Sequence, residues 1–332
     1  MAALSNQCGG LVLYLLVPTY CPDPTAADML KMNVLLAAIS AANVLLAAAY
    51  FPAHPPHCPS ASASVGKARE AGISVASLWA SWAAMSRNRA FVVICAVYAV
   101  IVGVSNCTSS LLTANLAAVG ADQATAGWVG FAANLGALVV GVLLGVVTDR
   151  LKSRRGALKY ALVATVASSG LGYAAYWLLL SGLGPAAAGG AGGGQGLLLT
   201  ALAYCAATAL LGAAIPVMFD LAAELTFPQP EGAMLMYLTG AMNFVGILVL
   251  AAPASSFFLW ANPATACVGI AGAALLAIFT PNSAPRFEFD EDAKRAGAGG
   301  RSARASVAGF NGDDVAELGD DPAEDDEVAG LI

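Results

Sequence analysis

Seven long apolar stretches constrain the fold of this chain more than any other feature. They are about 20 to 27 residues long, and they occupy 32–51, 90–116, 126–148, 156–180, 196–219, 233–252 and 256–280. About 20 apolar residues in a helix span the hydrocarbon core of a bilayer. Only 11% of the residues are charged, whereas soluble domains carry about 25%. The sequence therefore predicts an all-α polytopic membrane protein.

The basic residues predict which ends of these helices face the cytoplasm. Lys and Arg concentrate in 52–89, 149–155 and 281–304, and they are absent from 117–125, 182–195 and 253–260. Short loops rich in Lys and Arg stay on the cytoplasmic side. Seven alternating spans place the three basic segments on one side, together with the acidic loop 220–232. We predict that this side is cytoplasmic.

The segments outside the spans have their own compositions. Residues 52–89 begin with a Pro/Ser/His-rich linker, and 73–85 carry Trp79 and Trp82 three residues apart. This spacing suits a helix that lies on the headgroups, although an ordinary solvated loop is an equal alternative. The tail 281–332 has a net charge of -8, whereas the rest of the chain has +2. Its few large apolar residues predict disorder.

A set of residues with a regular spacing runs from the end of the apolar stretch 126–148 into the short basic loop that follows. The set is Gly145, Asp149, Arg150, Arg154 and Arg155. An aspartate at a helix end can bind an arginine or cap a neighbouring helix, so the set could act as a conformational latch. A plain basic loop is the alternative. The spacing resembles the loop signature of the major facilitator superfamily, except that Lys152 stands where that family prefers glycine.

Three further motifs resemble the solute carrier 49 family. They are AYFPAHPP at 49–56, AGWVGF at 126–131, and the acidic run that begins at Asp220 and Glu224 and ends at Glu231-Gly232. The family includes the feline leukaemia virus subgroup C receptor-related proteins and the disrupted-in-renal-carcinoma transporter, and the motifs are most similar to the latter. The resemblance covers residues from about 9 to 280.

This resemblance implies a twelve-helix transporter made of two six-helix halves. Residues 1–51 would then be a remnant of the N-terminal half, comprising the end of helix five at 9–18 and helix six. Residues 90–280 would be the C-terminal half, with the N-terminal helices missing from this sequence. The implied function is transport of a small organic solute by alternating access. A heme- or choline-type transporter and a non-transporting half-length membrane protein that binds partners are the alternatives.

Polar side chains within the apolar stretches are the candidates for the substrate cavity, because such groups are costly in lipid. They are Asn106, Thr108, Asn134, Tyr237, Thr239 and Asn243. The resemblance places Asn243 at a cavity amide of the family. It places Asn106 near an aromatic position of the choline-transporting members, which disfavours choline-type recognition. For Thr108 and its neighbours Ser109 and Ser110, the alternative to a role in the cavity is that each hydroxyl donates to a carbonyl oxygen of the preceding helical turn.

Acidic residues mark two further candidate sites. Asp220 and Glu224 lie at a cytoplasmic helix end, where anchoring to the basic loops is favoured over proton coupling. Glu327, Leu331 and Ile332 match an acidic dileucine pattern, which a sorting adaptor reads as an extended peptide. The pattern favours an endolysosomal or vacuolar membrane, with the plasma membrane as the alternative. The expected partners are the lipid bilayer and a small-molecule substrate, with proton coupling left open.

Other function classes lack support in the sequence. No phosphate-binding loop, nucleophile elbow or HExxH motif occurs, so the sequence predicts a protein that is not an enzyme and has no cofactor. The two histidines stand in a proline-rich linker without partner ligands, which argues against a metal site. Outside the short loops there is no basic patch that would predict nucleic-acid binding.

Overall fold

The structure is a computed structural model of the chain. It describes Leu11, Tyr14, 25–50, 60–62, Val65, 74–151, 156–182, 194–251, 254–282 and 285–298. Within these residues every regular element is a helix. Seven are long and apolar enough to cross a membrane: α2 (Ala26–Tyr50), α5 (Arg89–Ser110), α7 (Gln123–Leu151), α8 (Ala157–Leu180), α9 (Gly194–Thr226), α10 (Glu231–Leu250) and α11 (Ala254–Phe279). The predicted all-α polytopic class is confirmed.

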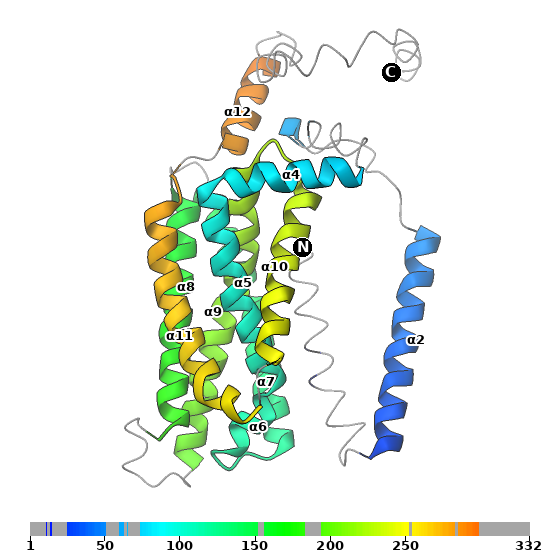
Figure 1. The fold of residues 1–332 in the computed structure, drawn as a ribbon, viewed down its shortest axis with the longest axis vertical. Coiled ribbons are helices and arrows are strands. Elements are labelled where there is room, and N and C mark those ends of the chain that lie inside the picture. Colours follow the sequence, from blue (N-terminus) through cyan, green and yellow to red (C-terminus); the bar gives the residue numbers. More distant parts are fainter. Residues whose placement is uncertain are drawn as a thin grey trace.

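Six of the long helices form one bundle, and α2 stands apart from it (Figure 1). The main packed pairs are α8 with α11, α7 with α9, α8 with α9, and α5 with α10 and α11. In α2, Met32 is the one buried residue. Tyr14 packs against the bundle, because its ring lies against Gly130 of α7. The bundle therefore has its own core, and α2 contributes almost nothing to it.

The polar stretch Ser105–Ser110 lies at a helix end and not at the centre of a span. The sequence predicts one span from 90 to about 116, but α5 ends at Ser110 and Leu111 leaves the helical conformation. The short helix α6 (Leu112–Ala117) follows. Ser105 Oγ lies 2.7 Å from the Tyr173 hydroxyl, which lies 3.2 Å from Thr208 Oγ1. These hydroxyls join α5, α8 and α9, because buried polar groups need partners.

The helix α4 (Val75–Arg87) crosses the end of the bundle that we predict to be cytoplasmic (Figure 1). Ser74 begins it with a capping box, in which its side chain and that of Ser77 each accept a backbone N–H of the other. Trp82 Nε1 donates to the carbonyl oxygen of Ala233 at 3.0 Å, so α4 is tied to the start of α10. The segment 73–85 therefore contains a helix and is not a solvated loop. That this helix lies on the lipid headgroups stays a prediction.

The first part of the tail differs from the predicted disorder. Pro285–Ala298 forms the helix α12. Proline suits the first position of a helix, because its fixed φ matches and its missing N–H needs no partner there. Glu288 in the first turn and Arg295 in the last turn complement the helix dipole. Residues 299–332 lie outside the described part of the chain.

Candidate functional site

The helix pair α5 and α10 carries the predicted polar residues that face outward from the bundle. The pair packs closely where Gly103 meets α10: a Cβ on Gly103 would lie 2.9 Å from the carbonyl oxygen of Met242. Asn106, one turn further along α5, donates from Nδ2 to the sulfur of Met242 at 3.7 Å. Asn243 follows Met242 in α10, so the two asparagines lie at the same level of the pair.

The side chains of Asn106 and Asn243 are both exposed, although both residues lie in apolar helices. Thr239 is also exposed and lies one turn before Asn243, on the same side of α10. Asn106 and Ser110 are related in the same way on α5, and the Ser110 hydroxyl donates to the carbonyl oxygen of Asn106 at 3.0 Å. We define Asn106, Ser110, Thr239 and Asn243 as the polar strip of α5 and α10.

An exposed amide in a membrane-spanning helix needs a polar environment. Moving an amide from water into an apolar medium without a partner costs about 1–3 kcal/mol by mutational data. Polar residues within spans accordingly face a bundle interior or a water-filled cavity. The amide and hydroxyl groups of the polar strip carry no charge, so they can offer a solute neutral hydrogen bonds.

The structure places two other candidates away from this strip. Thr108 is fully buried, and its hydroxyl donates to the carbonyl oxygen of Val104 at 3.1 Å. Asn134, in α7, donates from Nδ2 to the carbonyl oxygen of Gly130 at 2.9 Å. Both side chains therefore use their hydrogen bonds within their own helices.

Tyr237 belongs to the junction of α4 and α10. Its hydroxyl lies 3.1 Å from Ser86 Oγ, and its ring meets those of Trp82 and Phe91 edge-on, with centroids 6.0 and 5.5 Å apart. Such pairs stabilise a contact by about 0.5–1.5 kcal/mol beyond the buried area. This tyrosine therefore fixes α4 against α10 at the predicted cytoplasmic end.

The latch residues are described only in part. Asp149 and Arg150 are exposed in the last turn of α7, and a Cβ on Gly145 would meet no atom within 4 Å. Thr148 Oγ1 donates to the Gly145 carbonyl oxygen at 2.9 Å. Arg154 and Arg155 lie outside the described residues, as do Glu327, Leu331 and Ile332 of the predicted sorting motif.

The acids of α9 have different surroundings. Asp220 is exposed, whereas Glu224 is half-buried and accepts the backbone N–H groups of Arg286 and Phe287 at 3.0 and 3.2 Å. Anchoring was the favoured prediction for Glu224. Its partner is the start of α12, which lies in the basic segment 281–304, and the bonds come from backbone N–H groups. The sequence analysis missed Arg286 and Asp290 because both lie in a tail expected to be disordered.

Comparison with known proteins agrees with the motifs. Two curated relatives, from Xenopus laevis and Xenopus tropicalis, each carry the name solute carrier family 49 member 4 homolog. They are 29% and 28% identical to this chain over 269 residues, which is 75% of this chain and 55% of the relative. The predicted resemblance to solute carrier family 49 is confirmed. No family model matches the sequence.

The chain spans about half the length of these solute carrier 49 relatives. Together with the seven apolar helices, the similarity supports a multi-pass integral membrane protein.

Proposed function

We propose that this chain forms part of a transporter that moves a small organic solute by alternating access. The polar strip of α5 and α10 is the observation that carries the proposal, because exposed amides in apolar spans require a polar cavity. The names of the relatives, which are solute carriers, support the same function. Residues 90–280 then correspond to the C-terminal half of a major-facilitator fold, whose solute site lies between two halves near the midplane.

The chemistry of the strip favours a solute that is recognised through neutral polar groups. Within the described spans, charged residues lie near the helix ends. The polar strip and the adjacent Met242 therefore offer a solute amides, hydroxyls and a thioether. The strip residues on α5 are Asn106 and Ser110, and neither is aromatic, so the strip lacks a ring for cation–π binding of a quaternary ammonium. A neutral organic solute is therefore favoured over a choline-type cation.

Uptake into vesicles tests this proposal. The chain is reconstituted in liposomes and exposed to a defined mixture of neutral, cationic and anionic metabolites, and retained solutes are measured by mass spectrometry. We expect a neutral solute to accumulate. Asn243→Ala and Asn106→Ala each lower its uptake about tenfold, because each removes one hydrogen bond to the solute.

The control for these variants is Thr265→Val, because the Thr265 hydroxyl is buried in α11 and donates to the carbonyl oxygen of Ala261 at 2.8 Å. It should transport as the unmodified chain does. Equal uptake by the Asn243 and control variants would remove Asn243 from the site. A folded chain that accumulates no solute would favour the non-transporting membrane protein instead.

We also propose that the conformational latch includes Asp149 and Arg150. Both are exposed at the end of α7, where an ion pair can form in one conformation and break in another. Asp149→Asn should lower the rate of uptake and leave the affinity for solute unchanged, because the residue is remote from the polar strip. A change in affinity alone would contradict this role.

For location, we propose an endolysosomal or vacuolar membrane, on the basis of Glu327, Leu331 and Ile332. The double change Leu331→Ala with Ile332→Ala should redirect a fluorescently tagged chain to the plasma membrane, since the adaptor would lose the apolar pair. An unchanged distribution of the tagged chain would show that this motif does not direct sorting. The start of α12 donates two N–H groups to Glu224, so we assign Glu224 to anchoring and not to proton coupling. Uptake unaffected by collapse of a pH gradient would agree.

A further inference from the structure

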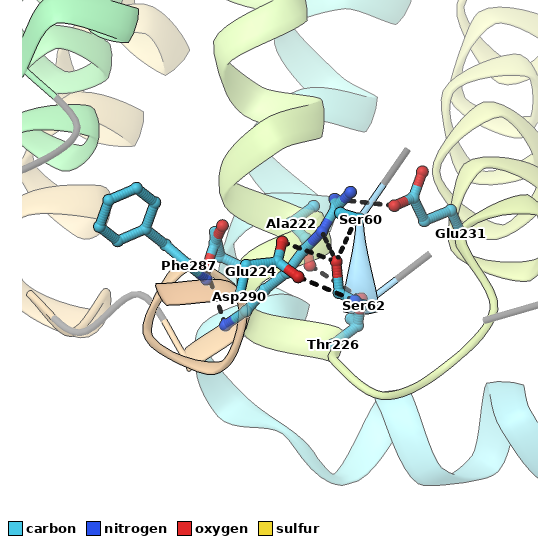
Figure 2. A network of polar contacts seen from close by, with 9 residues as sticks. Ser60, Ser62, Ala222, Glu224, Thr226, Glu231, Phe287 and Asp290 are labelled. Carbon is cyan, nitrogen blue, oxygen red and sulfur yellow. Dashed lines mark hydrogen bonds and ion pairs between the residues drawn. The ribbon is translucent and has the colours of Figure 1, made fainter. Parts of the chain in front are cut away.

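Three segments that are far apart in the sequence meet at the predicted cytoplasmic end of the bundle (Figure 2). The first is the linker around Ser62, and the second is the junction of α9 and α10 with Glu224 and Glu231. The third is the first two turns of α12, which carry Arg286 and Asp290. Hydrogen bonds and one ion pair join all three, so α12 contacts both the bundle and the linker.

The bundle holds α12 at its N-terminus. One carboxylate oxygen of Glu224 accepts the backbone N–H groups of Arg286 and Phe287, at 3.0 and 3.2 Å. These N–H groups have no partner within their own helix, and a carboxylate there also complements the positive end of the helix dipole. The rings of Phe227 and Phe289, with centroids 5.3 Å apart, add an apolar contact.

Side chains of α12 hold the linker. Asp290 accepts the backbone N–H of Ser62 at 2.8 Å and its hydroxyl at 2.9 Å. Arg286 donates from Nε to Ser62 Oγ at 3.3 Å and pairs through Nη1 with Glu231 at 2.7 Å. Ser62 is only 5% exposed as a result. A single short helix thus fastens the linker to the bundle.

We propose that α12 is a strap that docks in cis on the α9–α10 junction and fixes the linker there. In the sequence, Ser62 lies between α2 and α4, so the strap fixes a point of the linker that joins these two helices. The inference stands on these contacts and does not depend on the transport function.

Hydrogen exchange of the backbone tests the strap. The full chain is reconstituted in nanodiscs of neutral phosphatidylcholine, and mass spectrometry follows peptides that cover 58–65 and 285–298. Glu224→Ala removes the two hydrogen bonds that hold the N-terminus of α12, so we expect exchange to become about tenfold faster in both peptides. Asp290→Ala removes only the grip on the linker, so we expect faster exchange in 58–65 and a smaller change in 285–298.

The matched control is Lys294→Ala. It removes the exposed pair between Lys294 and Glu291 within α12, at 3.2 Å, and within the described part of the chain Lys294 has no polar contact with the bundle or the linker. Its exchange in 58–65 should equal that of the unmodified chain. Peptides of α8 report whether each variant keeps the bundle folded, and Glu224→Gln, which retains one acceptor oxygen, replaces Glu224→Ala if they lose protection.

Two results would overturn the strap. In the first, Glu224→Ala and Lys294→Ala give the same exchange in 285–298, so the bonds to Glu224 do not hold α12. In the second, Glu224→Ala deprotects 285–298 while 58–65 stays protected, so α12 does not hold the linker. Faster exchange of both peptides in Glu224→Ala, with the linker alone affected in Asp290→Ala, supports it.

Discussion

The ammonium group of Lys159 donates to the carbonyl oxygen of Thr280 at 2.6 Å, which joins the start of α8 to the end of α11. Lys159 is 9% exposed, so this contact is the main compensation that the described residues show for burying its charge. A cation at a helix C-terminus is favoured both by the unpaired carbonyl groups and by the helix dipole.

We therefore expect Lys159→Met to destabilise the bundle by about 2 kcal/mol, because the terminal carbonyl of α11 loses a charged donor. Thermal unfolding in detergent, followed by circular dichroism, measures the change. Lys294→Met is the control, since Lys294 is exposed and, among the residues that the structure describes, pairs with Glu291 of the same helix. Equal melting temperatures for the two variants would show that the contact with Thr280 contributes no stability.

A second prediction concerns the crossing of α8 and α11 at Gly170. A Cβ at this position would lie 2.8 Å from the backbone nitrogen of Ile270 and 3.0 Å from the carbonyl carbon of Gly269. Backbone atoms cannot move aside as a flexible side chain can, so Gly170→Ala should separate the two helices and cost about 1–3 kcal/mol.

Gly240→Ala is the matched control for this variant. Gly240 is also helical, but a Cβ there would meet no atom within 4 Å. The change should be neutral or stabilise by up to about 1 kcal/mol, because alanine favours helix. Chemical unfolding of both variants gives the comparison, and a stable Gly170→Ala protein would mean that the crossing is looser than the structure shows.

The sequence sufficed to predict seven spans, because bilayer thickness and apolar composition determine them without knowledge of any partner, but it did not predict the break at Leu111 that ends α5. It could not predict α12, since that helix is capped by Glu224, 62 residues earlier, and packs on Phe227. Its own charged composition resembles that of a disordered segment. Tertiary contacts of this kind override local composition.

The sequence predicts which residues are candidates for the site, but it does not predict which of them lie on the same exposed surface. Polar residues in apolar spans were enough to select Asn106, Thr108 and Asn243. Which of them face outward depends on how α5 and α10 pack: Asn106 meets Met242, whereas Thr108, two residues away, points into the core. The rotation of a helix about its axis is set by its neighbours, and the near-uniform apolarity of α5 leaves it unspecified in the sequence.

A third prediction concerns Tyr173, which is fully buried and links three helices through its hydroxyl. Tyr173→Phe leaves Ser105 and Thr208 without this shared partner, and the expected cost is about 1–3 kcal/mol of unfolding free energy. Tyr160→Phe, at a 60% exposed position of the same helix, should change stability little. If both variants unfold at the same denaturant concentration, the hydroxyl cluster does not stabilise the bundle.

The last prediction separates the two tryptophans of α4. Trp82 donates to the Ala233 carbonyl oxygen and packs on Tyr237, whereas Trp79 is 63% exposed and meets only the edge of Trp82 among the described rings. Trp82→Phe keeps an aromatic ring but removes the hydrogen-bond donor, so α4 should bind the start of α10 less tightly. The lost hydrogen bond is worth about 1 kcal/mol, so the backbone amides of α4 should exchange several-fold faster. Trp79→Phe should leave that exchange unchanged, because it removes no bond between α4 and α10. Faster exchange in the Trp79 variant alone would mean that α4 is held by the membrane surface and not by the bundle.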